Sequence, residues 1–191
     1  MSNIFLNELE CGGPGTSIGY PNLRSCVSLT AVLANGTLVG AHLTREGDIA
    51  VVAPRFVKTI GAEGIKRLYL IGGYTLAGDL HGGMAAHPAK VASALGYSGQ
   101  VGMYDTSRFL AVLLVVDQAD LSGQVRVQYK DWDKLTPDNS PMQKGEHPYK
   151  DTKNPYVSIT LDVKRKPKKS DNAPALIMHT IPPKKLTIVD V

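Results

Sequence analysis

Two residues of this chain have the types and spacing of a nucleophile and its base. Cys26 and His42 are sixteen positions apart, and the stretch between them is centred on Asn35-Gly36, a pair typical of a turn between two strands. A free thiol with a pKa near 8.5 is only a few per cent thiolate at neutral pH. Contact with an imidazolium that lowered this pKa to about 6 would make it roughly 90% thiolate. Such a pair can attack an acyl carbon and protonate the leaving nitrogen.

The register of the predicted hairpin, residues 26–44, decides whether the two side chains meet. A two-residue loop at 35–36 would mix apolar and polar side chains on both faces. A three-residue loop at 34–36, closed by Gly36 in the left-handed region, makes one face wholly apolar. Because a one-residue slip moves every side chain to the other face, the second register is favoured. Its apolar face comprises Val27, Leu29, Ala31, Leu33, Val39, Ala41 and Leu43.

In this register Cys26 and His42 share the opposite face. His42 lies directly across from Ser28, and Cys26 is its diagonal neighbour, within reach of an imidazole. The small residues Ser28 and Gly40 predict a face open enough for a substrate side chain. The competing interpretation is a buried cysteine and a surface histidine at a sheet edge. A functional histidine would normally have a third group to orient it.

The other reactive side chains form weaker patterns. Two cysteines are too few for a disulfide framework or a four-cysteine zinc site, and Cys11 is expected to pack in a loop rather than to pair with an oxidised Cys26. Asp79, His81 and His87 surround a Gly-Gly pair, but their irregular spacing favours solvated loop residues over metal ligands. We therefore predict neither a metal nor a cofactor.

Composition and charge limit the remaining possibilities. The chain has 191 residues, 43% hydrophobic and 20% charged, which predicts one globular domain (1–191). Within this domain we expect a core at about 17–130 and a strand-containing extension at about 131–191. The net charge of +4 comes mainly from a basic run at 164–169, which is typical of a solvated linker, so no nucleic-acid partner is expected. No membrane span or secretory signal is apparent, which predicts a cytoplasmic protein or export without a cleavable signal. Trp132 is expected to cover the core at its boundary rather than to anchor a partner.

Hydrophobic patterning predicts a mixed α/β domain with mostly antiparallel strands. The segment before residue 19 is rich in glycine and is expected to be a loop. Residues 131–155 are expected to form a long surface excursion. The predicted helices span 61–67 and 88–95, the latter ended by Gly96. The predicted strands after the hairpin span 68–71, 109–116 (buried on both faces), 124–129, 156–163, 175–181 and 186–191.

An ordered set of motifs resembles the cysteine deamidase superfamily. The motifs are SIG at 17–19, LRSCVSL at 23–29 and LVGAHLT at 38–44, followed by the weaker LIGG at 70–73 and YDTSR at 104–108. That superfamily includes the chemoreceptor glutamine deamidases and the catalytic domains of cytotoxic necrotizing factor-type toxins. The resemblance covers about residues 17–116 and none of the C-terminal extension.

The resemblance implies a layered α/β/β sandwich of the α/β (α+β) class and hydrolysis of a Gln or Asn side-chain amide in a partner protein. Cys26 would be the nucleophile, His42 the base and acid, and Ser17 the group that orients the histidine, with oxyanion donors in the backbone near Cys26. No cofactor would be needed. In the chemoreceptor enzymes a threonine stands at the position of Ser17, but three extra residues follow it here. The toxins orient the histidine with a main-chain carbonyl instead.

Two other functions fit the same residues. A non-catalytic protein-binding module on this scaffold would have an unreactive thiol at Cys26. A cysteine protease would use the same pair but cut the peptide backbone of its substrate. Deamidation differs from proteolysis in leaving the partner chain intact.

Overall fold

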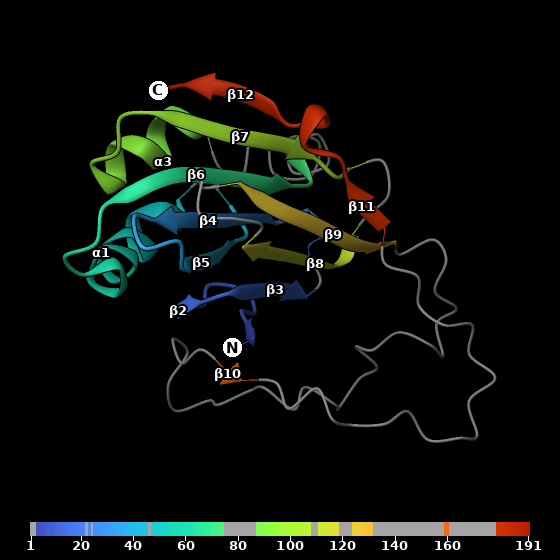
Figure 1. Cartoon of the computed structure of the whole chain (residues 1–191), viewed down its shortest axis with the longest axis horizontal. Helices are drawn as coiled ribbons and strands as arrows, with labels where there is room; N and C mark the ends of the chain where they lie inside the picture. Colours follow the sequence, from blue (N-terminus) through green and yellow to red (C-terminus); the bar gives the residue numbers. More distant parts are fainter. Residues whose placement is uncertain are drawn as a thin grey trace.

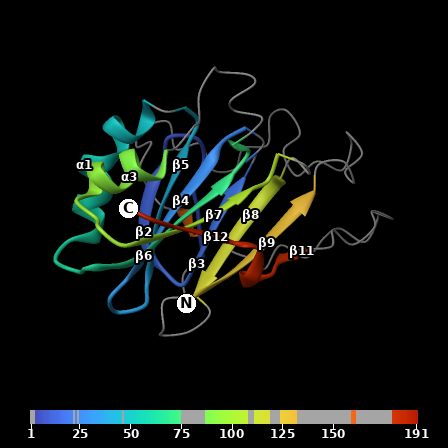
Figure 2. The same cartoon turned by 90° about the horizontal axis from the view of Figure 1, so that it is seen from above.

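A computed structural model describes residues 3–21, 23, 25–45, 47–74, 87–107, 111–118, 124–131, 159–160 and 179–191 of the chain. The described residues form two α-helices and two mixed, mostly antiparallel sheets stacked in layers (Figure 1). Figure 2 shows that the helices cover one face of one sheet and that the other sheet packs against the opposite face of that same sheet. The predicted α/β (α+β) class with an α/β/β layering is therefore confirmed.

The sheet that carries the helices is called here the central sheet, with strand order β12-β7-β6-β4-β5-β2. The other, with order β10-β1-β3-β8-β9-β11, is called the outer sheet. The strands of the central sheet are β2 (Cys11–Gly15), β4 (Val27–Leu33), β5 (Leu38–Leu43), β6 (Ile65–Gly72), β7 (Gln100–Asp105) and β12 (Thr187–Asp190). Those of the outer sheet are β1 (Asn3–Phe5), β3 (Ser17–Pro21), β8 (Ala111–Gln118), β9 (Val125–Asp131), β10 (Ile159–Thr160) and β11 (His179–Ile181). The helices are α1 (Asp48–Ile60) and α3 (Pro88–Leu95), and a 3₁₀ turn spans Pro183–Lys185.

The β4–β5 hairpin has the predicted three-residue register. Val27 pairs with Leu43 and Ser28 with His42, and Gly36 closes the turn with φ of 84°. The apolar face that this register creates lies in one core cluster with α1 and α3, as expected from the alternation of side chains along a strand. The opposite face contributes Cys26 to a second cluster, between the two sheets.

The helix predicted at 61–67 is wrong, since α1 ends at Ile60 and β6 begins at Ile65. Helix α1, which the sequence analysis does not predict, has apolar residues spaced three and four apart. Pro54, a residue that disfavours helix interiors, lies inside it. Gly61, with φ of 67°, ends the helix. The helix predicted at 88–95, by contrast, is confirmed, with Gly96 left-handed at its end.

The N-terminal segment predicted as a loop forms strands β1, β2 and β3. Glycine and proline fit into β2 because it is an edge strand, and its pairing with β5 shifts register between Gly12 and Gly15. In β3, Gly19 lies so close to Phe5 of β1 that a Cβ atom would be 2.7 Å from the ring atom Cδ1. The glycines of this segment therefore allow the strands to pack closely, and they do not mark an irregular loop.

The later strands broadly follow the predictions, and the C-terminal extension joins both sheets. β6, β9 and β12 lie where strands were expected, and β11 and β12 pair with β9 and β7. In β8, Leu114 and Val116 are buried but Val115 is only half-buried, so burial on both faces was wrong. The physical reason is that β8 lies in the outer sheet and packs inward against the central one. Among the described residues, no helix is both long and apolar enough to cross a membrane.

Several predictions fall on residues outside the described ranges. These are the roles of Asp79, His81 and Trp132, nearly all of the 131–155 excursion, and the basic run at 164–169.

Candidate active site

Cys26 lies at the end of the central sheet, one residue before β4. The ladder between β4 and β6 continues past their paired ends, since Gly73 N–H donates to the Cys26 carbonyl at 3.0 Å. On the other side, the β4–β5 register places Thr44 across from Cys26 and His42 diagonally beside it. The thiol-bearing residue is thus held between two strands at the end of the sheet.

His42 is held by the segment that connects β1 to β2. The His42 carbonyl accepts from Leu9 N–H at 2.9 Å, and His42 N–H donates to the Glu10 carbonyl at 3.0 Å. The ring atom Nδ1 lies 3.0 Å from the Leu6 carbonyl oxygen, so Nδ1 carries the proton and donates it. Nε2 is then the acceptor nitrogen, and it is buried without a hydrogen-bond partner among the described residues.

The structure does not bring Ser17 to His42. Ile18 and Tyr20 of β3 face the core between the sheets. Because side chains alternate along a strand, Ser17 faces away from the central sheet and from His42. The group that contacts Nδ1 is the main-chain carbonyl of Leu6, which no side-chain motif in the sequence indicates.

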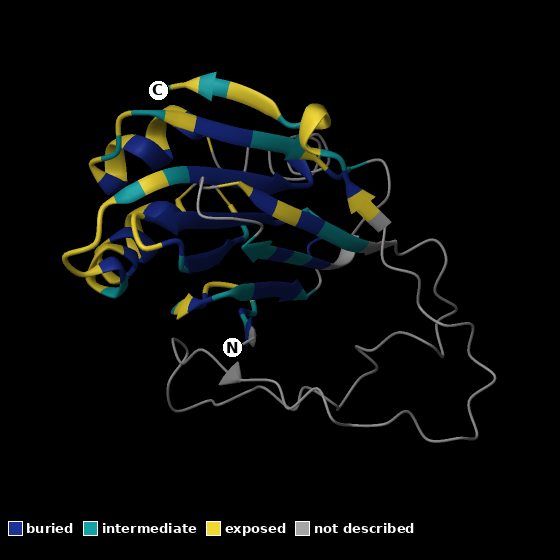
Figure 3. Ribbon diagram, viewed as in Figure 1, coloured by how far each residue is buried: buried dark blue, intermediate teal, exposed yellow. Residues whose placement is uncertain are grey.

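The face shared by Cys26 and His42 is covered, contrary to the expectation of an open face. His42 and Ser28 are 0% exposed and Cys26 is 6% exposed; Figure 3 shows β4 and β5 buried along their length. The outer sheet packs over this face, and the Tyr20 ring meets the His42 ring edge-on with centroids 6.2 Å apart. The Ser28 hydroxyl donates to the Ile71 carbonyl at 2.8 Å, so it is already paired.

The electrostatics of the pair also differ from the expectation of a depressed thiol pKa. Burial, followed by the negative charges of Glu8 and Asp48, raises the pKa of Cys26 to about 12. Burial lowers the pKa of His42 to about 4, against the opposing effects of the Leu6 carbonyl and Asp48. No hydrogen bond joins the two side chains in the described part of the chain. Both groups are therefore neutral at pH 7, because the imidazolium that would lower the thiol pKa does not form.

Asp48 is a site-forming residue that the sequence interpretation missed together with helix α1. Its carboxylate accepts hydrogen bonds from Thr44 N–H and the Thr44 hydroxyl, each at 2.6 Å, and from Arg45 N–H at 2.9 Å. These bonds join the end of β5 to the first turn of α1. The signal that could have found it is an aspartate at the start of an amphipathic helix.

Cys11 lies on the other face of the central sheet from Cys26. In β2 it pairs with Ala41 of β5, and it packs in the helix-covered core, with Sγ 4.0 Å from the Thr59 hydroxyl. Burial raises the pKa of Cys11 to about 11. Packing as a small buried residue was the favoured prediction, although in a strand rather than a loop. Both cysteines are free thiols.

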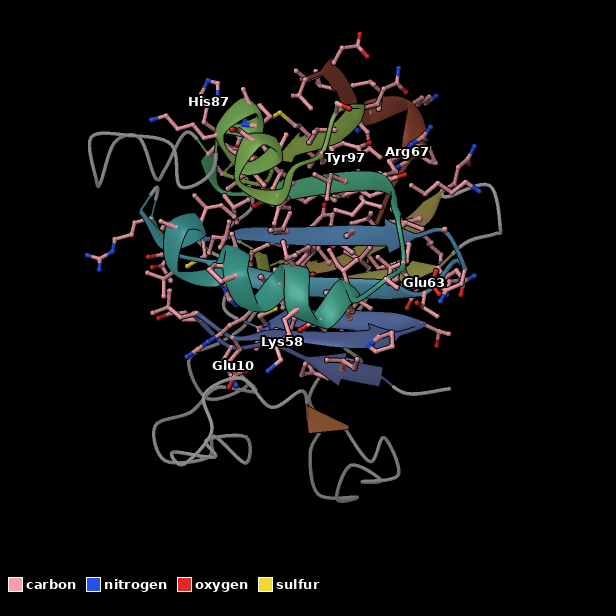
Figure 4. All side chains as sticks on the ribbon, turned by 90° about the vertical axis from the view of Figure 1, so that its left-hand side faces the viewer. Glu10, Lys58, Glu63, Arg67, His87 and Tyr97 are labelled. Carbon is pink, nitrogen blue, oxygen red and sulfur yellow. The ribbon has the colours of Figure 1, made fainter. Side chains whose placement is uncertain are left out.

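A hollow of about 370 Å³ opens on the helix side of the molecule, away from this pair. It lies between the C-terminal ends of α1 and α3 and is lined by Ile60, Glu63 and Tyr97, among others. Figure 4 shows Glu63 and Tyr97 on this side of the ribbon. His87, an expected loop residue, is exposed just before α3. The described residues contain no group of three or more His, Cys, Asp or Glu side chains arranged to hold a metal ion.

The buried neutral imidazole predicts a specific acid sensitivity. The pKa of His42 is about 4 in the folded protein and near 6.5 in the unfolded chain, so the unfolded state binds more protons between these values. The neutral imidazole of His42 thus contributes fully to stability above pH 6.5, and this contribution is lost as the pH falls toward 4. From pH 7.5 to 4.5 we expect His42 to lower the free energy of unfolding by about 2.5 kcal/mol.

Urea unfolding of the wild type and His42→Gln at the two pH values measures this effect. Carboxylates also titrate in this range, but they do so in both proteins, so the difference between the two pH dependences isolates His42. Parallel pH dependences would contradict the lowered pKa.

In comparisons with known proteins, no protein-family model matches this chain, and a search of curated proteins finds no match.

Proposed function

We propose that this protein is a thiol-dependent amidohydrolase that converts a Gln or Asn side chain of a partner protein to the acid. One observation carries the proposal: Nδ1 of His42 is fixed on the Leu6 carbonyl, while Nε2 is buried, without a partner among the described residues, and on the same sheet face as Cys26. A main-chain carbonyl that orients the histidine is also the arrangement expected of the toxin branch of the cysteine deamidase superfamily. Ser17 has no role in this version of the proposal.

The neutral state of both groups determines the order of the proposed steps. Since neither side chain is charged at pH 7, the Cys26 proton moves to Nε2 of His42 while Sγ bonds to the amide carbon. The imidazolium then protonates the leaving nitrogen, the C–N bond breaks and ammonia departs. Water attacks the thioester, the C–S bond breaks, and the product acid and the free thiol are released. The overall change is amide plus water to acid plus ammonia, with no cofactor.

The burial of the pair favours this chemistry once a substrate is bound. Cys26, at 6%, is the more exposed member of the pair, while His42 is 0% exposed. A substrate amide that arrives from the end of the sheet is therefore expected to reach Cys26 before His42. Water exclusion around the pair strengthens the interaction between a developing thiolate and imidazolium.

The same observations leave a second candidate function, a protein-binding module with an inert thiol. It is favoured by the raised pKa of Cys26 and because, within the described ranges, no hydrogen bond joins Cys26 to His42. The two functions differ in whether an amide is hydrolysed.

The test is to incubate the protein with cell lysate in H₂¹⁸O and to map changed side chains by mass spectrometry. Deamidation through a thioester replaces NH₂ by ¹⁸OH, which adds about 3 Da to a Gln or Asn in an uncut chain. A lysate without the protein provides the background of spontaneous deamidation. Conversion confined to particular sites supports the proposal. No conversion above background would favour the binding module, and new chain ends would indicate a protease.

A further inference from the structure

Thr106 lies in the same row of the central sheet as Cys26. The parallel pair β6–β7 aligns Gly72 with Asp105, and Thr106 N–H donates to the Gly72 carbonyl at 2.8 Å. One residue further, Gly73 is next to Thr106 on one side and to Cys26 on the other. The row across the sheet thus reads Cys26, Gly73, Thr106, on three adjoining strands.

The three residues of this row also share a face. Ile71 and Tyr104, two residues before Gly73 and Thr106, face the core between the sheets, and so does Cys26. Thr106 directly follows the last residue of β7, and the alternation of that strand, continued by one residue, puts the Thr106 side chain on that face. The Cα atoms of Cys26 and Thr106 are separated by twice the strand spacing, about 9–10 Å. Because Gly73 has no side chain, nothing from the intervening strand fills the space directly between them.

The Thr106 hydroxyl has no hydrogen-bond partner among the described residues, although Thr106 is 0% exposed. Buried hydroxyls are almost always paired, because an unpaired one loses its bonds to water. In the described part of the chain, Nε2 of His42 is the other unpaired buried side-chain N or O atom on this face. A third such atom, the Tyr74 hydroxyl, belongs to the helix-covered core on the other face. The two unpaired groups therefore flank Cys26, one on each side.

We propose that the Thr106 hydroxyl binds the oxygen of the substrate carboxamide over Gly73. This inference rests on the proposed function and adds to it how the amide is oriented. His42 lies on the β5 side of Cys26 and Thr106 on the β7 side. An amide carbon at Sγ then has its NH₂ group toward His42, which protonates it, and its oxygen toward Thr106. As Sγ bonds to carbon, the C=O electron pair moves to oxygen, and the Thr106 O–H donates to that developing oxyanion.

The first experiment compares Thr106→Val with Thr106→Ser in amide hydrolysis. Valine keeps the shape and removes the hydroxyl, so kcat/KM is expected to fall about 30- to 100-fold; serine keeps the donor and should stay within about threefold. Thr59→Val is the matched control, since its hydroxyl bonds the Arg55 carbonyl on the helix side of the central sheet. A structural role predicts a destabilised Thr106→Val protein, whereas removal of an unpaired buried hydroxyl should leave its melting temperature unchanged or higher.

A second measurement separates this inference from the proposed function. The rate at which chloroacetamide, which carries a carboxamide, alkylates Cys26 is divided by the rate at which methyl methanethiosulfonate, which carries none, forms a mixed disulfide with Cys26. Thr106→Val should lower this ratio about fivefold or more, and Thr106→Ser and Thr59→Val should not change it. If the ratio falls in a protein that hydrolyses no amide, the amide site stands and the proposed hydrolysis fails. An unchanged ratio and an unchanged kcat/KM in Thr106→Val would overturn the role of Thr106.

Discussion

Cys26→Ala is expected to reduce ammonia release by at least about a thousandfold, because loss of a nucleophile removes the covalent pathway. Cys11→Ala should leave the rate within about threefold of the wild type. The two cysteines form a matched pair: both are buried free thiols of the central sheet, and they lie on opposite faces of it. The rates are measured as ammonia produced from a substrate identified by the ¹⁸O mapping.

The pair of variants also controls for folding. Each substitution removes one buried sulfur, so both proteins should lose a similar free energy of unfolding, about 1 kcal/mol. If only Cys26→Ala loses activity, the loss is then due to removal of the nucleophile and not to lower stability. Equal rates in the two variants would exclude Cys26 as the nucleophile and leave the non-catalytic interpretation.

The hairpin was predictable because one physical constraint decides it. Only one register gathers seven apolar side chains on a single face, and that same register fixes where Cys26 stands relative to His42. Helix α3 was predictable for a similar local reason, with proline at its first position and glycine just past its end. Helix α1 has only one of these signals, the glycine just past its end (Gly61): its N-cap residue is Gly47, without a side-chain bond, and Pro54 lies inside it.

The environment of the pair depends on segments far apart in the sequence. The outer sheet that covers His42 comes from the N-terminal strands and from residues after 110, and the pairing of these strands leaves no short-range pattern. The Leu6 carbonyl is a backbone group, so residue type cannot indicate it. For this reason the sequence predicted the positions of Cys26 and His42 on one face but not their burial or the direction of their pKa shifts.

Gly72, the last residue of β6, and Gly73 after it connect the fold to the candidate site. Gly72 lies across from Val27, and a Cβ atom at Gly72 would be 2.6 Å from the Val27 Cα and in collision with the Cys26 carbonyl oxygen. Both are backbone atoms, so no side-chain rotation can relieve the contact. The start of β4, which carries Cys26, must move away from β6 if the residue is larger than glycine.

Gly72→Ala is therefore expected to lower the free energy of unfolding by about 3 kcal/mol or more, the upper range for overpacking a buried site. It should also reduce amide hydrolysis, because the Cys26 carbonyl that Gly73 N–H binds would be displaced. Gly64→Ala is the control, since a Cβ atom there has no neighbour within 4 Å, and it should change stability by less than about 1 kcal/mol. Urea unfolding of the two variants measures the difference. If Gly72→Ala were as stable as Gly64→Ala, the close approach of β4 and β6 behind Cys26 would be contradicted, and with it the row in which Cys26, Gly73 and Thr106 stand.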